Sequence, residues 1–137
     1  MVNISSKRRT GTEHAQSVMN ALRKADRPIS AYEIMAAIGN GRDLAPATVY
    51  RALDRLVREG QVHKLESLNA FIACRHPEQH ATPAFAICDC CGTVTEFSPR
   101  ELVAGLAKWC RASAFELKTA TLELHGTCQS CQMRGAG

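Results

Sequence analysis

The apolar positions in the first half of the chain follow the period of an α-helix in successive segments. Residues 12–25 carry apolar side chains at spacings of three and four, which predicts an amphipathic helix that ends before Pro28. Ser30 and Glu33 have the spacing of a capping box, which opens a second helix, and Gly39 begins the break after it. The pattern therefore predicts two helices joined by a short connection.

A third helix is predicted to begin at or just after Pro46 and to end at Gly60. Its two faces differ in polarity, so one should be buried and the other exposed. The expected buried stripe consists of Val49, Ala52, Leu53, Leu56 and Val57. The expected outer face consists of Thr48, Tyr50, Arg51, Asp54, Arg55 and Arg58.

Two short runs of β-prone residues follow this helix. They cover residues 61–66 and 70–74, and the segment between them, residues 67–69, suits a hairpin turn. Three helices followed by a two-stranded hairpin form a winged helix-turn-helix, in which the last helix before the wing enters the major groove of DNA. Tyr50 and Arg51, near the start of that helix, are the residues best placed to reach base edges.

The second half of the chain alternates between strand and helix patterns. Residues 75–83 are polar, contain two prolines and are typical of a linker. Strands are expected at residues 84–88 and 93–97, a helix opening at Ser98, Pro99 and Glu101, and a final strand over 114–125. The apolar stripe of the predicted helix is Leu102, Val103, Leu106 and Cys110. A module of roughly 55 residues has a small interior, so we expect a structural metal, a dimer partner or both to stabilise it.

Charge is unevenly distributed along the chain, whose 137 residues carry a net charge of +4. Residues 1–75 hold 12 Lys and Arg against 7 Asp and Glu, a net +5, whereas residues 76–137 hold 5 against 6, a net −1. The basic half is therefore the candidate for contact with a polyanion. A merely solvated basic surface would give the same count, so the winged-helix pattern has to decide between the two.

The cysteine content points to metal binding. The first twelve residues are polar and basic, and no apolar run is long enough to span a bilayer, so we expect a cytoplasmic protein without a membrane partner. Thiols stay reduced in that compartment, which favours metal ligation over disulfides. The seven cysteines are Cys74, Cys88, Cys90, Cys91, Cys110, Cys128 and Cys131.

Two Cys-x-x-Cys pairs, Cys88 with Cys91 and Cys128 with Cys131, carry the strongest chemical signal in the sequence. Each pair directs two thiolates toward one point, and two pairs supply the four soft ligands of a tetrahedral zinc ion. Four protein ligands leave no open coordination position, so such a site supports the fold and does not activate water. We therefore expect that the protein is not an enzyme and has no small-molecule substrate. Cys90 lies inside the first pair and is an alternative to Cys91 as a ligand.

Four segments resemble, in order, the signatures of the ferric-uptake-regulator superfamily. They are residues 47–54 (ATVYRALD), 62–67 (VHKLES), 88–92 (CDCCG) and 125–131 (HGTCQSC), and they extend over most of the chain. The resemblance implies metal-dependent repression by a homodimer that binds a duplex DNA operator. It also identifies Tyr32, Tyr50 and Arg51 as DNA contacts, to which Thr48 on the outer face of the third helix is added.

The fold class expected from both lines of argument is α+β. A winged-helix DNA-binding domain is predicted for residues 1–75 and an interdomain linker for residues 76–83. A small α/β dimerisation domain that holds the four-cysteine zinc is predicted for residues 84–137.

Within the superfamily, the chain resembles the zinc-uptake repressors. Iron-type members have a His-His-x-His run before the first cysteine pair, whereas only His76 and His80 stand there in this chain. The regulatory zinc site of the zinc-uptake repressors maps onto His63, Cys74, His80 and Glu96, with His76 as an alternative to His80. A thiolate among imidazoles favours Zn²⁺ over Fe²⁺ or Mn²⁺. The sequence thus predicts two Zn²⁺ sites per chain and a zinc-responsive repressor of zinc-uptake genes.

Other functions remain open at this level. An iron- or peroxide-sensing regulator of the same superfamily is the nearest alternative. A zinc-stapled interaction module, or a thiol redox protein that uses Cys90 and Cys91, would be a different class of protein. Zinc-dependent binding to duplex DNA separates the last two from a repressor, since neither predicts it.

Overall fold

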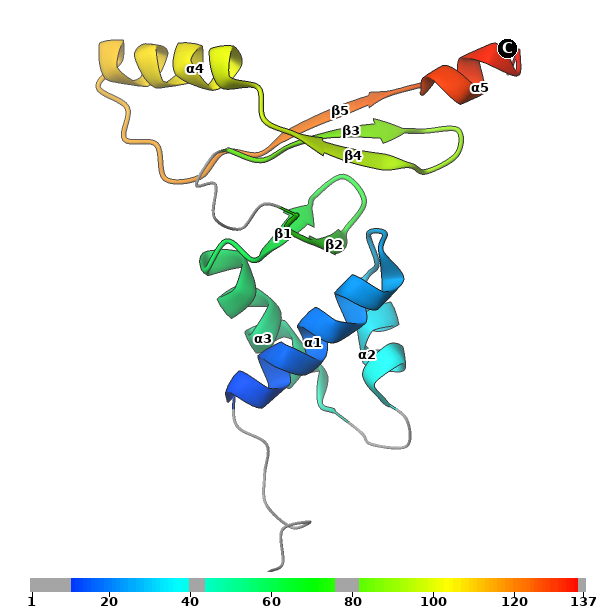
Figure 1. The fold of residues 1–137 in the computed structure, drawn as a ribbon. Coiled ribbons are helices and arrows are strands. Elements are labelled where there is room, and N and C mark those ends of the chain that lie inside the picture. Colours follow the sequence, from blue (N-terminus) through cyan, green and yellow to red (C-terminus); the bar gives the residue numbers. More distant parts are fainter. Residues whose placement is uncertain (1–10, 40–43, 76–81, 136–137) are drawn as a thin grey trace, which may run out of the picture. The chain divides into compact units, whose positions relative to one another are not determined.

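The computed structural model describes residues 11–39, 44–75 and 82–135. The chain divides into two compact units, Met1–Pro77 and Glu78–Gly137, which we call the N-terminal and C-terminal units. Each unit combines helices with a small sheet (Figure 1). The mixed α and β content confirms the predicted fold class.

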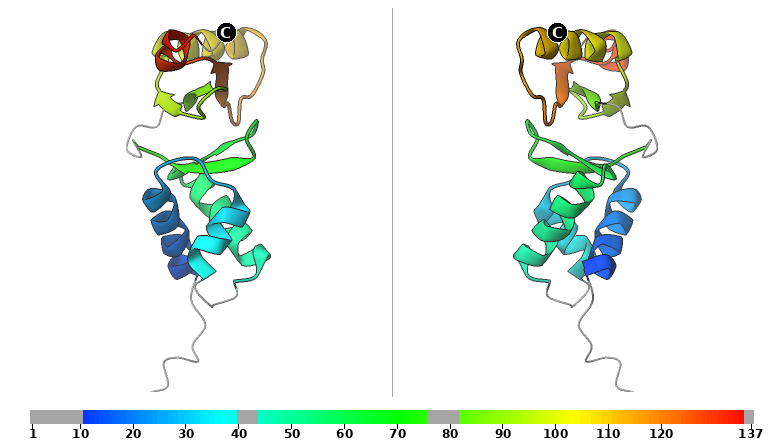
Figure 2. Two further views of the ribbon diagram at one scale, coloured as in Figure 1. Left: turned by 90° about the vertical axis from the view of Figure 1, so that its right-hand side faces the viewer. Right: turned by 90° about the vertical axis from the view of Figure 1, so that its left-hand side faces the viewer.

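The N-terminal unit consists of three helices and a hairpin. The helices are α1 (Gly11–Ala25), α2 (Ala31–Gly39) and α3 (Pro46–Arg58), and the hairpin is formed by β1 (Val62–Leu65) and β2 (Ala70–Ala73). The three helices pack together, and the hairpin lies at one end of them (Figure 2). Side chains from all three helices and from the hairpin form one core, including the fully buried Leu22, Ile34, Leu53 and Val62.

Backbone hydrogen bonds attach the wing to the helical core. Strands β1 and β2 are antiparallel, with His63 opposite Ile72. Phe71 and Ile29 exchange two backbone hydrogen bonds of 2.8 and 3.0 Å, so β2 also pairs with the segment between α1 and α2. This pairing gives the hairpin a fixed position on the three helices.

Helix α3 has the predicted start and end. Pro46 occupies its first turn, and Gly60 follows its C-terminus at φ +74°, a left-handed conformation that favours glycine. Val49, Ala52, Leu53 and Leu56 are buried as predicted, but Val57 is 39% exposed. Successive residues of an α-helix are about 100° apart, so Val57 falls at the edge of the buried stripe and the prediction for it was wrong.

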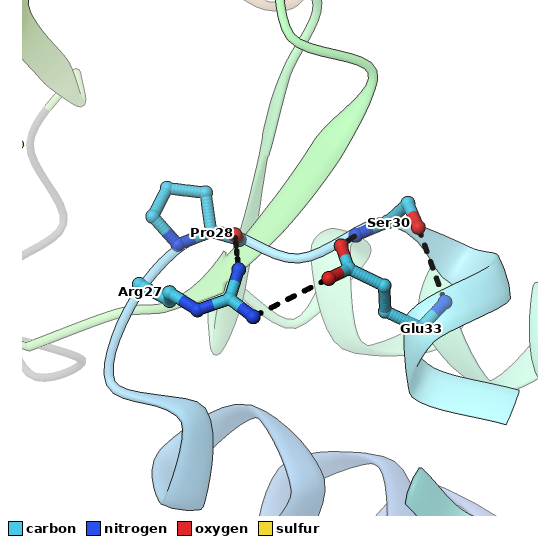
Figure 3. Close-up of polar contacts among 4 residues, drawn as sticks. All are labelled: Arg27, Pro28, Ser30 and Glu33. Atoms are coloured by element: carbon cyan, nitrogen blue, oxygen red, sulfur yellow. Dashed lines mark hydrogen bonds and ion pairs between the residues drawn. The ribbon is translucent and has the colours of Figure 1, made fainter. Parts of the chain in front are cut away.

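The predicted capping box opens α2 (Figure 3). The backbone N–H of Glu33 donates to Ser30 Oγ at 3.1 Å, and the backbone N–H of Ser30 donates to Glu33 Oε1 at 2.9 Å. Arg27 reaches the other carboxylate oxygen of Glu33 at 3.3 Å. The hydrogen bond from the Ser30 backbone, followed by Arg27, holds the pKa of Glu33 below its ordinary value.

We expect Ser30→Ala to lower the free energy of unfolding of the N-terminal unit by about 1 kcal/mol, because one backbone N–H at the start of α2 loses its acceptor. Urea denaturation followed by circular dichroism measures this loss. Ser30→Thr keeps a hydroxyl acceptor and should lose little. The contribution of Glu33, whose pKa is lowered by folding, is present above its ordinary pKa and disappears as pH falls through the folded-state pKa. A Ser30→Ala protein as stable as the wild type would contradict the assignment of the cap.

The C-terminal unit contains a three-stranded sheet and two helices. The strands are β3 (Ala84–Cys88), β4 (Val94–Phe97) and β5 (Leu122–Gly126), and the helices are α4 (Arg100–Ala112) and α5 (Gln129–Met133). The strand order is β4-β3-β5, with β3 antiparallel to β4 and parallel to β5. The expected final strand over 114–125 was too long, because regular structure begins again only at Leu122.

The interior of the C-terminal unit is small. Its buried apolar side chains among the described residues are Ala84, Phe85, Ile87, Cys88, Cys110 and Cys131. Leu102 was expected in the buried stripe of α4 but is 52% exposed. Trp109 and Leu124 are also exposed, at 59% and 53%. Cys110 is buried at 8% exposure, as predicted for a core residue. A unit with so few buried side chains depends on further contacts for its stability.

Candidate metal sites and nucleic-acid surface

Four cysteines of the C-terminal unit gather at one point. Cys88 ends β3, Cys91 lies in the turn that follows, and Cys128 and Cys131 lie at the start and in the middle of α5. All four Sγ atoms lie within 4.8 Å of one another. The Sγ atoms of Cys88 and Cys131 are 3.8 Å apart, and so are those of Cys91 and Cys128.

These distances fit a tetrahedral zinc ion. Zinc binds thiolate sulfur at about 2.3 Å, and a tetrahedron of that size has sulfur-to-sulfur edges of about 3.8 Å. Both of the sulfur pairs above match this edge. Cys88 and Cys131 are buried, Cys128 is half-buried and Cys91 is exposed. Four sulfurs fill a tetrahedral coordination shell, so the donor set suits a structural ion with no position for substrate.

Backbone hydrogen bonds favour the thiolate form of the first cysteine pair. The backbone N–H groups of Cys128 and Cys91 donate to Cys88 Sγ at 3.3 and 3.4 Å. These bonds, that from Cys128 first, lower the pKa of Cys88 to about 6. The Thr93 hydroxyl, 3.1 Å from Cys91 Sγ, is the main cause of a lowered pKa for Cys91. The first pair is thus prepared to bind a cation as thiolates.

Cys90 lies beside the site but outside the group of four. Its side chain is exposed, whereas Cys131 is buried. A side-chain hydrogen bond with Cys90, followed by burial, raises the pKa of Cys131 well above its ordinary value. Coordination to a metal ion deprotonates a thiol, because the cation stabilises the negative thiolate. A bound cation would therefore lower the pKa of Cys131.

A polar contact that the sequence did not indicate ties the two cysteine pairs together. The carboxylate of Asp89, inside the first pair, accepts a hydrogen bond from His125, with 2.9 Å between Oδ1 and Nδ1. The backbone N–H of Asp89 also donates to the carbonyl of Gly126 at 2.8 Å. No sequence pattern identified Asp89 as the partner of His125.

The four residues predicted for the regulatory site are distributed over the chain. His63 lies on β1 and Cys74 directly follows β2, so both belong to the N-terminal unit. A ring nitrogen of His63 and Cys74 Sγ lie within 4.8 Å of each other, close enough to share one metal ion. Glu96 lies on β4 of the C-terminal unit. His80, together with its alternative His76, lies outside the described residues.

The predicted DNA-binding residues lie on the surface of the N-terminal unit. Tyr32, in the first turn of α2, is 78% exposed, and Tyr50 on α3 is 49% exposed. Arg51 is exposed and Thr48 is half-buried on the same helix. Their exposure leaves both aromatic side chains accessible to another molecule.

Comparison with known proteins gives consistent matches over nearly the whole chain. Residues 8–125 match the ferric uptake regulator family. The zinc uptake regulation protein of Escherichia coli K12 is 34% identical over 122 residues, which are 88% of this chain and 71% of that protein.

Two solved structures share the fold at higher coverage. A zinc uptake regulator in complex with zinc and DNA is 32% identical, with a TM-score of 0.82 over 90% of this chain and 84% of that one. A crystal structure of holo XcZur is 38% identical, with a TM-score of 0.81 over 94% of this chain and 91% of that one.

Proposed function

The chain belongs to the ferric uptake regulator family, and we propose that within this family it is a zinc-responsive repressor that binds duplex DNA. The observation that carries the proposal is its likeness, at 32% identity and a TM-score of 0.82, to a zinc uptake regulator bound to zinc and DNA. Its regulated genes would be those for zinc uptake, as the name of the Escherichia coli relative indicates.

The N-terminal unit has the elements that DNA recognition requires. Three helices and a wing present α3, with Tyr50 and Arg51 exposed near its start. In a winged helix-turn-helix, residues at this position reach base edges in the major groove. Tyr32 and Thr48 complete the proposed contact set.

The first proposed zinc ion is structural and is held by Cys88, Cys91, Cys128 and Cys131. The sulfur-to-sulfur distances of 3.8 Å support this assignment. The ion would link the end of β3 to α5, a helix of only five residues that buries little else besides Cys131. When bound, it supplies cross-links that the small interior of the C-terminal unit lacks.

The second proposed zinc ion is regulatory and is held by His63, Cys74, His80 and Glu96. The closeness of His63 and Cys74 in the wing supports it, because two of the four ligands already converge within one unit. One thiolate, two imidazoles and one carboxylate form a donor set that suits zinc better than iron or manganese. His76 is the alternative to His80.

This ligand set explains how zinc would control DNA binding. Its members come from the wing, from the segment after it and from the C-terminal unit, so a shared ion would restrict the movement of one unit against the other. In a dimer, that restriction sets the spacing of two α3 helices, which must match half-sites roughly 34 to 36 Å apart. A coupling free energy of about 1 to 3 kcal/mol is enough to change affinity about 5- to 150-fold.

The proposed dimer involves the C-terminal unit. Leu102, Trp109 and Leu124 on α4 and β5 are each more than half exposed, and Phe115 is 55% exposed. We propose that these side chains contribute to the interaction surface of the unit. A second copy of the chain would bury them and enlarge the small interior.

None of the helices in the part of the chain that the structure describes has the length and apolar content of a membrane-spanning segment.

The test of the proposed function is zinc-dependent binding to duplex DNA. Purified protein is titrated with zinc, iron(II) and manganese(II) in separate series, and binding to DNA selected from a random pool is measured by fluorescence anisotropy. We expect tight, sequence-selective binding with zinc alone. Preferential activation by iron, or loss of binding after treatment with peroxide at constant zinc, would instead indicate one of the related sensor types.

Arg51→Ala is expected to weaken operator binding by about 1 to 3 kcal/mol and to relax sequence preference, because an arginine can donate two hydrogen bonds to one guanine. Lys64→Ala is the contrasting variant, since Lys64 lies on the wing and pairs with Glu66 at 3.5 Å. It should cause at most a small, sequence-independent loss. Equal losses on operator and unrelated DNA for Arg51→Ala would reassign Arg51 to the DNA backbone.

A further inference from the structure

A hollow of about 560 Å³ lies in the N-terminal unit, between the first turn of α1 and the outer face of α3. It is lined mainly by long polar side chains, in contrast to the apolar core on the other face of α3. The polar lining consists of His14, Thr48, Arg51, Asp54, Arg55 and Arg58. Of these residues, Thr48 and Arg51 belong to the proposed DNA contacts.

The hollow is strongly cationic. Three guanidinium groups line it against the single carboxylate of Asp54. Arg51, Arg55 and Arg58 stand at spacings of four and three, which places them on one face of α3. Like charges on one helix face repel one another, and an anion bound among them would offset that repulsion.

One of the three arginines is already occupied by contacts within the unit. Arg55 Nε lies 3.1 Å from a carboxylate oxygen of Glu59, and Arg55 Nη1 donates to Thr12 Oγ1 at 3.5 Å. Arg55 therefore connects the start of α1 to α3 as a brace. Arg51 and Arg58 are exposed and make no ion pair with any residue that the structure describes.

The spacing along α3 places Arg51 and Arg58 at different points along the helix. Seven residues at 1.5 Å per residue place Arg58 about 10 Å further along the helix axis than Arg51. The major groove is about 12 Å wide. In the proposed complex, with Arg51 at the bases and the C-terminal end of α3 leading out of the groove, Arg58 would lie near the edge of the groove, where the phosphates are.

We propose that this hollow binds a DNA backbone phosphate. Arg58 contacts the phosphate, and Arg55 holds α1 against α3 and so shapes the hollow. The proposal rests on the proposed DNA binding and adds to it a division of labour along one helix. Arg51 reads bases, Arg58 fixes the position of the helix on the backbone, and Arg55 holds α1 against α3 without contacting DNA.

The dependence of affinity on salt distinguishes these roles. Operator and unrelated duplex DNA are titrated with the zinc-loaded full chain between about 50 and 200 mM salt, for the wild type, Arg58→Ala, Arg58→Lys and Arg55→Ala. Each lost phosphate contact should reduce the slope of log affinity against log salt by about 0.9 per bound protomer. Arg23→Ala is the matched control, because Arg23 is exposed on α1 and does not line the hollow.

We expect Arg58→Ala to reduce the salt slope and to weaken binding by the same factor on both DNA molecules, and Arg58→Lys to keep the slope. Arg55→Ala should keep the slope and lower the midpoint of thermal unfolding. An unchanged slope for Arg58→Ala, or an equal reduction for Arg23→Ala, would contradict the proposed phosphate-binding site while leaving the proposed function intact. A wild-type protein that does not bind DNA with zinc would overturn both.

Discussion

Cys128→Ser should remove one tightly held zinc ion per chain and, with it, the dimer and much of the fold of the C-terminal unit. Structural zinc sites contribute on the order of 10 kcal/mol to folding, more than a small domain can lose. Cys128 Sγ lies 3.8 Å from Cys91 Sγ, and the Cys128 backbone N–H donates to Cys88 Sγ, so this residue joins both halves of the cluster. Metal analysis after exhaustive dialysis, together with analytical ultracentrifugation, measures the outcome.

Cys90→Ser is the matched control for this experiment. Cys90 lies one position from Cys91 but outside the group of four converging sulfurs. Its replacement should leave zinc content, dimerisation and thermal stability close to those of the wild type. A folded, dimeric and fully zinc-loaded Cys128→Ser protein would disprove the structural role of the site. Loss of zinc from Cys90→Ser would show that Cys90 is a ligand.

Cys74→Ser should abolish the zinc dependence of operator binding while leaving the dimer and the structural zinc intact. Cys74 directly follows β2, and its backbone N–H donates to the carbonyl of Gln61 at 2.9 Å, so the backbone there is held without the thiol. The serine hydroxyl is a poor ligand for zinc compared with a thiolate. Zinc titration with labelled operator DNA, alongside metal counting, checks this expectation.

The control for Cys74→Ser is Cys110→Ser. Cys110 is a cysteine of the C-terminal unit buried on α4, outside both groups of proposed ligands. The Cys110→Ser substitution should alter stability without changing the zinc concentration needed for DNA binding. If Cys74→Ser binds operator at the wild-type zinc concentration, Cys74 is an ordinary cysteine of the wing and the regulatory site needs a different ligand set.

Local pattern was sufficient for most elements of the N-terminal unit. The spacing of apolar residues, the Ser30 and Glu33 capping box and the stop at Gly60 each act over a few residues, so they are visible in the sequence itself. The same holds for the cysteine pairs, because Cys-x-x-Cys spacing fixes the distance between two ligands before the chain folds. The resemblance to the regulator family also relied on short segments, residues 47–54, 62–67, 88–92 and 125–131.

The predictions of secondary structure were wrong where contacts with distant segments decide whether a strand or helix forms. Residues 114–121 were expected to continue a strand, but β5 is only as long as its pairing with β3, from Ala84 opposite Leu122 to Cys88 opposite Gly126. Helix α5 was not predicted, since its five residues are too few to show a repeat and its one buried side chain is Cys131. A strand without a neighbour has no partner for its backbone hydrogen bonds, whatever its propensity.

The sequence by itself determined the helices, the wing, the two cysteine pairs and the class of regulator, because each depends on residues that are near one another along the chain. Only the tertiary structure decided that the two pairs converge at 3.8 Å, that Asp89 meets His125, and that Arg55 connects α3 to Thr12 of α1. These are contacts between residues some 36 to 43 positions apart, and packing of distant elements brings them together. Spacing in the sequence carries no information on such distances, which is why they required the fold.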